Sequence, residues 1–231
     1  MRTITLGPLT VHLTGGTDRE GGGDGPLVVL LHGFGAPGTD LVPLWRELGA
    51  PPGTRFAFPE APLALDAHGD ARAWWMIDLE KLEAALAGGE LRDLTRDVPE
   101  GLADARGRVS AMLDELDAPQ IVLGGFSQGA MLALDVALHS ERRLAGLALM
   151  SGTLLAEHAW IPLMPKRAGL RVVQSHGRLD PLLPFSIAER LQRELTAAGL
   201  EVTFIPFNGG HEIPGSVIDA LDGFLSATLA P

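Results

Sequence analysis

One short segment near the middle of the chain constrains the fold more than any other. Residues 121–123 form an apolar run suited to a buried strand, and residues 128–140 have the pattern of a helix. Between them, Gly125-Phe-Ser-Gln-Gly129 fits G-x-S-x-G, in which a serine occupies a sharp, strained turn between a strand and a helix. Glycines on either side leave room for such a turn. The segment therefore predicts an α/β sheet that presents Ser127 at its carboxyl end.

The rest of the chain alternates apolar runs with helical patterns, which indicates the α/β class: a mostly parallel central sheet with helices on both faces. Strands are expected at 27–31, 55–58, 144–150, 172–176 and 202–207, and helices at 40–48, 100–116, 185–198 and 216–229. Residues 3–6 and 11–13 predict an antiparallel hairpin at the sheet edge. Residues 62–99 are less regular, with a helical pattern at 79–87, and predict a short insert over the active-site end. We expect a single domain over residues 1–231.

Composition excludes several functional classes. The chain has 18 basic and 29 acidic residues, a net charge of −11, and no basic cluster, so no nucleic acid is expected as a partner. It has no cysteine and no His or carboxylate cluster with ligand spacing, so neither a metal nor a cofactor is expected. The start of the chain lacks a signal-peptide core, and no run suits a membrane span. We therefore expect a cytoplasmic protein without stable membrane insertion.

A serine nucleophile requires a base and a group that orients the base. Asp180 and His211 each follow an expected strand, so both should lie at the carboxyl ends of the sheet, near Ser127. The order Ser127, Asp180, His211 is the serine–acid–histidine order of α/β-hydrolases. We expect His211 to take the proton from Ser127, and Asp180 to fix the tautomer of His211.

Two backbone amides are candidates for an oxyanion hole: that of Gln128, directly after the nucleophile, and that of Phe34, in the loop after the strand at 27–31. The nearby histidine His32 has a structural alternative, bonding to backbone, which we favour over catalysis. His176 closes a strand and is expected to pack or bond locally. Glu212 competes with Asp180 as the acid, but it directly follows His211, and adjacent side chains rarely face each other.

Four motifs together resemble the phospholipase/carboxylesterase family of α/β-hydrolases, which includes the acyl-protein thioesterases: Leu31-His-Gly-Phe-Gly35, Gly124-Gly-Phe-Ser-Gln-Gly-Ala130, His176-Gly-x-x-Asp-Pro181 and Gly209-Gly-His211. The resemblance extends from about residue 27 to the end of the chain. It implies the same triad and oxyanion donors. It also implies that an acyl pocket is bordered by Trp74, Trp75, Leu154 and Leu155. After Phe34-Gly35 the chain reads Ala-Pro-Gly, without the acidic residue expected in eukaryotic acyl-protein thioesterases, which favours a bacterial-type carboxylesterase.

The expected function is hydrolysis of carboxylic esters with short to medium acyl chains, through an acyl-enzyme on Ser127 and without a cofactor. Within enzymes, the alternatives are acyl-thioester hydrolysis, on acyl-protein or acyl-CoA substrates, and lysophospholipase activity. Outside the enzymes, the alternative is a non-catalytic binding protein with the same α/β-hydrolase fold. The expected partner is a small-molecule ester, and an exposed apolar insert would also support a homodimer.

Overall fold

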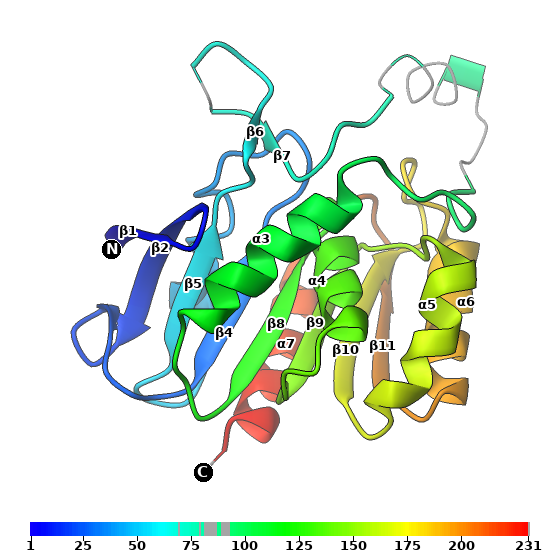
Figure 1. The fold of residues 1–231 in the computed structure, drawn as a ribbon. Coiled ribbons are helices and arrows are strands. Elements are labelled where there is room, and N and C mark those ends of the chain that lie inside the picture. The colour runs from blue at the N-terminus through cyan, green and yellow to red at the C-terminus, as the bar shows by residue number, and fades with distance from the viewer. Residues whose placement is uncertain (69, 79, 81–86, 89–92, 231) are drawn as a thin grey trace.

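The central sheet places the strand before Ser127 in its middle. The computed structural model describes residues 1–68, 70–78, 80, 87–88 and 93–230 (Figure 1). The strands of the main sheet span Arg2–Leu6 (β1), Leu9–Gly16 (β2), Glu20–Gly22 (β3), Leu27–Leu31 (β4), Arg55–Pro59 (β5), Ile121–Phe126 (β8), Gly146–Met150 (β9), Arg171–Gly177 (β10) and Glu201–Phe207 (β11). Their order is β1-β2-β5-β4-β8-β9-β10-β11, with β3 paired to β2. The strands from β5 to β11 in this order are parallel, whereas β1 and β2 are antiparallel at the edge, so the predicted mostly parallel sheet is confirmed.

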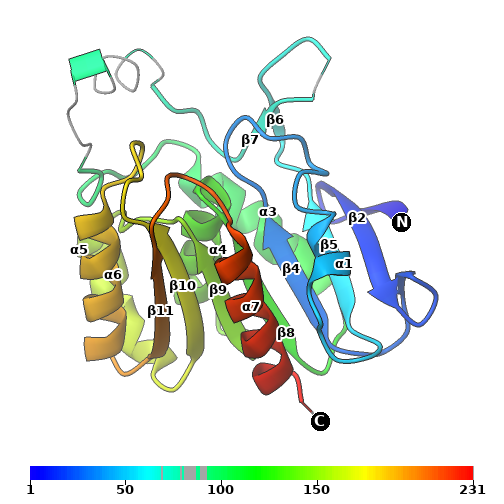
Figure 2. The same cartoon turned by 180° about the vertical axis from the view of Figure 1, so that it is seen from behind.

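Helices cover both faces of this sheet (Figures 1 and 2). One layer contains Leu102–Asp114 (α3), Gln128–His139 (α4), Glu157–Leu163 (α5) and Phe185–Ala197 (α6); the other contains Leu44–Glu47 (α1) and Gly215–Thr228 (α7). In β4, Leu27, Val29 and Leu31 pack into the first layer, and Val28 and Leu30 pack into the second. Burial on both faces is the reason that a parallel strand reads as a continuous apolar run.

The first described part of the insert lies at the carboxyl ends of the strands and contains the hairpin of Leu63–Ala64 (β6) and Arg72–Ala73 (β7) (Figure 1). The helical pattern at 79–87 falls mostly outside the described residues. The expected helix at 40–48 is wrong: only α1 is helical, and the preceding residues form turns with amides bonded three residues back. α5 was not expected, because Pro162 interrupts its sequence pattern. Among the described helices, none combines the length and apolar character needed to cross a bilayer.

Helix α4 lies at the centre of the first layer and buries a carboxylate. Asp135 is 1% exposed. Its Oδ2 lies 2.8 Å from Arg106 Nη1 of α3, and its Oδ1 accepts a hydrogen bond of 2.8 Å from Trp160 Nε1 of α5. His139, one turn further along α4, places Nδ1 3.2 Å from the same Oδ1. One carboxylate therefore connects three helices, and its charge has the partners that burial requires.

Removing this carboxylate should destabilise the fold strongly. Asp135→Ala leaves Arg106 and the indole N–H of Trp160 without their acceptor, so we expect a loss of about 3 kcal/mol in the free energy of unfolding, measured by urea denaturation. The control is Asp114→Ala, which removes the 74%-exposed partner of Arg142. An exposed pair of this kind contributes at most about 1 kcal/mol. Equal losses for the two variants would contradict a connecting role for Asp135.

Candidate active site

The turn at Ser127 has the strained geometry expected of a nucleophile elbow. Ser127 lies between β8 and α4 with φ 54° and ψ −118°, which is unusual for a residue with a side chain. The neighbouring glycines make the turn possible. A Cβ at Gly125 or Gly129 would lie 2.4 Å or 2.0 Å from the carbonyl oxygen of Leu31. The elbow therefore rests directly on the end of β4, and only glycine permits this approach at both positions.

Asp180 and His211, predicted as acid and base, are hydrogen-bonded. His211 Nδ1 lies 2.6 Å from Asp180 Oδ2, and the amides of Leu182 and Leu183 donate to Asp180 Oδ1 at 2.9 and 3.0 Å. Burial by itself raises the pKa of Asp180, but the bonds from His211 and from these amides outweigh it, so the pKa lies below its ordinary value. A carboxylate accepts only, so Nδ1 of His211 carries the proton and Nε2 keeps its lone pair. Glu212 instead accepts from the amide of Gly210.

Ser127 and His211 both line a cleft of about 460 Å³ at the carboxyl ends of the strands. Phe126, next to the serine, packs against the His211 ring with the ring centres 4.8 Å apart. Phe34 and Gln128 line the same cleft. In the described part of the chain, the amides of both residues have no acceptor, so their N–H groups are available to an oxyanion. The structure thus brings together all five residues predicted for the triad and the oxyanion hole.

The four residues expected at the acyl pocket divide into two pairs. Trp75 and Leu155 line the cleft, whereas Trp74 and Leu154 do not and lie in the core, 2% and 0% exposed. Only one residue of each adjacent pair therefore faces the cleft. The other apolar lining comes from Phe34, Ala36, Met76, Ile77, Leu94, Val98, Pro99, Phe126, Met131, Leu182 and Leu183. Leu182 and Leu183 could have been found from sequence, because they lie in the loop of Asp180.

Two other histidines near the site are buried and have structural roles. The amide of Ala61 donates to His32 Nε2 at 3.0 Å, so the proton of His32 is on Nδ1, which donates to the Gly33 carbonyl at 2.8 Å. His176 Nε2 donates to the Leu183 carbonyl at 3.0 Å. Burial lowers the pKa of both rings, which keeps them neutral near pH 7. His32 thus fixes the loop that holds Phe34.

The side chain of Gln128 has a role that sequence reasoning missed. This side chain is fully buried, and it bonds to two successive residues of the insert. Its Oε1 accepts from the amide of Trp74 at 2.9 Å, and its Nε2 donates to the carbonyl of Trp75 at 2.9 Å. The indole N–H of Trp74 donates in turn to the carbonyl of His32 at 3.0 Å. These bonds hold the insert, the elbow helix and the loop after β4 together.

Breaking the Gln128 bonds should affect both stability and the site. Gln128→Met keeps the backbone amide and the approximate volume, but it leaves the Trp74 amide and the Trp75 carbonyl buried without partners. We expect a loss of about 2–6 kcal/mol in the free energy of unfolding, at about 1–3 kcal/mol for each of the two groups. Reaction with a fluorophosphonate should also slow about tenfold, because Trp75 and the neighbouring lining shift.

The matched control is Gln192→Met on α6, whose amide bonds only to Thr196 at the surface. Its stability should stay within about 0.5 kcal/mol of the parent and its labelling rate should be unchanged. If Gln128→Met behaves like this control, the Gln128 side chain does not hold the insert.

Comparisons with known proteins agree with this geometry. The sequence model of the family described as Phospholipase/Carboxylesterase matches residues 21–229. Acyl-protein thioesterase 1 of Neurospora crassa is 26% identical over 87% of this chain and 86% of its own length; that of Eremothecium gossypii is 29% identical over 87% of each. The crystal structure of esterase PE8 superimposes with a TM-score of 0.73 at 28% identity, covering 94% of this chain and 97% of that one. The chain therefore belongs to the phospholipase/carboxylesterase family of α/β-hydrolases and is a hydrolase of the esterase and thioesterase kind.

Proposed function

We propose that this protein is a carboxylesterase that uses Ser127 as its nucleophile. Ser127 Oγ attacks the ester carbonyl while its proton passes to His211 Nε2, and the resulting oxyanion accepts bonds from the amides of Phe34 and Gln128. Collapse of this intermediate expels the alcohol, which takes the proton from His211. Water then attacks the acyl-enzyme, again losing a proton to His211, and the acid leaves with Ser127 restored.

The observation that carries this proposal is the pairing of Asp180 with His211 at 2.6 Å, beside the cleft that contains the strained Ser127. The carboxylate holds the His211 ring with Nδ1 protonated and stabilises the imidazolium that forms when Nε2 takes the serine proton. The hydrogen bond from His211 and those from the Leu182 and Leu183 amides outweigh the effect of burial and hold the pKa of Asp180 below its ordinary value, as this role requires. The volume of the cleft, about 460 Å³, and its apolar lining support short to medium acyl chains.

A thioester substrate is the second candidate, since the Neurospora and Eremothecium relatives are named acyl-protein thioesterases. The same triad serves esters and thioesters. The charge of the cleft argues against one member of this group, the acyl-CoA thioesters. Asp40, Asp78 and Asp97 line the cleft, and among its described lining residues there is neither lysine nor arginine. A leaving group with several phosphates would be repelled there, so a neutral ester or thioester suits the cleft better.

The first test is hydrolysis of p-nitrophenyl esters of increasing acyl length. Wild-type protein should cleave the short and medium esters, and Ser127→Ala and His211→Ala should each lose at least about 10³-fold in kcat, because the members of a triad act as a unit. Ser226→Ala, on the exposed face of α7, is the control and should retain full activity. A loss of less than about tenfold in Ser127→Ala would exclude it as the nucleophile. Wild-type protein that neither cleaves an ester nor reacts with a fluorophosphonate would instead support the binding-protein alternative.

The second test compares butyryl-CoA with the neutral thioester S-butyryl-N-acetylcysteamine. At low salt, we expect kcat/KM for butyryl-CoA to be on the order of tenfold lower than kcat/KM for the neutral thioester. This difference between the two substrates should become smaller as ionic strength rises. The double variant Asp40→Asn/Asp97→Asn should reduce the difference between the two substrates further, without changing kcat/KM for the neutral thioester. A preference for butyryl-CoA in the wild-type protein would contradict the charge argument while leaving Ser127 as the nucleophile.

A further inference from the structure

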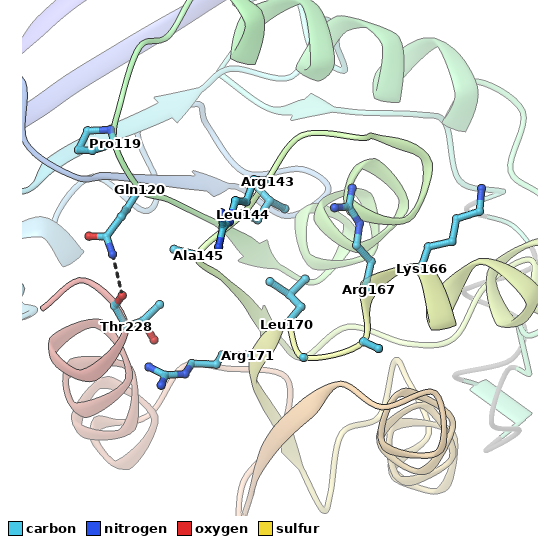
Figure 3. Close-up of a pocket in the computed structure, with 12 residues that line it drawn as sticks. Pro119, Gln120, Arg143, Leu144, Ala145, Lys166, Arg167, Leu170, Arg171 and Thr228 are labelled. Carbon is cyan, nitrogen blue, oxygen red and sulfur yellow. Dashed lines mark hydrogen bonds between the residues drawn. The ribbon is translucent and has the colours of Figure 1, made fainter. Parts of the chain in front are cut away.

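A second cleft, of about 590 Å³, lies at the opposite end of the parallel strands from Ser127 (Figure 3). It is bounded by the residues that lead into β8, β9 and β10, by the turn after α5 and by the end of α7: Pro119, Gln120, Arg143, Leu144, Ala145, Lys166, Arg167, Ala168, Gly169, Leu170, Arg171 and Thr228. Its volume falls within the range of small-molecule sites. Nothing in the proposed ester hydrolysis uses it.

The cleft gathers positive charge in a chain with a net charge of −11. Arg143, Lys166, Arg167 and Arg171 line it, and no carboxylate is among its described lining residues. Within the described structure, the side chains of Arg143 and Lys166 are exposed and make no hydrogen bond or ion pair, so both are available to a ligand. This concentration is the reverse of the catalytic cleft, which has carboxylates and no described cation in its lining.

Arg167 supplies a fixed charge. Its guanidinium donates to the carbonyls of Ala137, Ser140 and Arg142 at the end of α4. These acceptors are neutral, so the positive charge of Arg167 is held in place without being cancelled by a bonded carboxylate. Glu141, which lies between Ser140 and Arg142 in sequence, is an opposing charge near Arg167.

Arg171 and Thr228 form the other side of the cleft (Figure 3). Arg171 Nη1 donates to the carbonyl of Ala227 at 2.9 Å, and its Nε lies 3.7 Å from Glu201 Oε2 in an exposed pair. Thr228 is 7% exposed, and its hydroxyl is buried without a hydrogen-bond partner in the described structure. A buried hydroxyl without a partner is unfavourable, so an acceptor that a ligand brought to this side of the cleft would relieve that cost.

We propose that this cleft binds a small molecule with more than one phosphate group. Guanidinium groups recognise phosphate oxygens through paired donors, and an ammonium group adds a point charge. Arg143 and Lys166 would contact the phosphates directly, Arg167 would supply the fixed charge, and the Thr228 hydroxyl would donate one hydrogen bond. The volume exceeds what a single phosphate needs, which is the reason for assigning more than one phosphate group to the ligand.

The test is binding of inorganic pyrophosphate, measured by calorimetry and by thermal denaturation at constant ionic strength against sodium chloride. We expect a Kd below about 1 mM and a rise in the melting temperature, because a ligand that binds only the folded state stabilises it. Arg143→Glu with Lys166→Glu should weaken binding at least tenfold. The control, Arg2→Glu with Arg193→Glu, makes the same change of charge outside the cleft and should bind as wild type.

Thr228→Val tests whether the Thr228 hydroxyl contributes to ligand binding independently of any effect on stability. Because this hydroxyl has no partner among the described residues, valine should leave the unliganded protein at least as stable, while pyrophosphate binding weakens several-fold. Hydrolysis of p-nitrophenyl butyrate, where the wild type performs it, should be unchanged in every one of these variants. No pyrophosphate binding beyond the salt control, or equal binding by the Arg143→Glu/Lys166→Glu variant, would overturn the proposal. Sedimentation with phosphatidate vesicles but no binding of pyrophosphate would overturn it too, by identifying a lipid headgroup as the ligand.

Discussion

The site depends on how closely the elbow at Ser127 approaches the end of β4. With no side chain at Gly125 or Gly129, the carbonyl of Leu31 lies where a Cβ would otherwise sit. This contact fixes the start of α4 beside the loop that begins at His32. It therefore places the proposed nucleophile next to the loop of Phe34, whose amide has no acceptor among the residues that the structure describes. Backbone held in this way needs no rearrangement to meet a developing charge, which is the main contribution of an oxyanion hole.

Buried hydrogen bonds extend this arrangement to the insert. Gln128 supplies a proposed oxyanion donor through its backbone and holds Trp74 and Trp75 through its side chain. Trp74 in turn donates to the carbonyl of His32, so the lining of the cleft and the oxyanion loop are connected through a single network. Such networks are costly when only partly satisfied, which favours one arrangement of the site over looser ones.

The site residues could be predicted from the sequence wherever the reaction requires one type of residue at one position relative to a strand. The glycines around Ser127 and the positions of Asp180 and His211 after successive strands sufficed to predict that these side chains meet at one end of the sheet. Sequence reasoning failed where the outcome depends on packing across the fold. Residue spacing does not show that Asp135 is buried between three helices. Pattern alone also did not decide which of Trp74 and Trp75 faces the cleft, because the Trp74 ring is held in the core by a bond to the carbonyl of His32, which is distant in sequence.

The linings of the two clefts carry opposite charge, and this division has a functional consequence. At the carboxyl ends, carboxylates line the cleft of Ser127; at the amino ends, Arg143, Lys166 and Arg171 line the second cleft. An anion is repelled from the first and attracted to the second, so a phosphate-bearing molecule would not compete with an ester substrate. The two clefts lie at opposite ends of packed parallel strands, and coupling between them would require two arrangements of that core with different affinities for each ligand. A close-packed sheet does not have two such arrangements. The phosphate ligand would therefore raise the stability of the protein and leave the turnover of the ester unchanged.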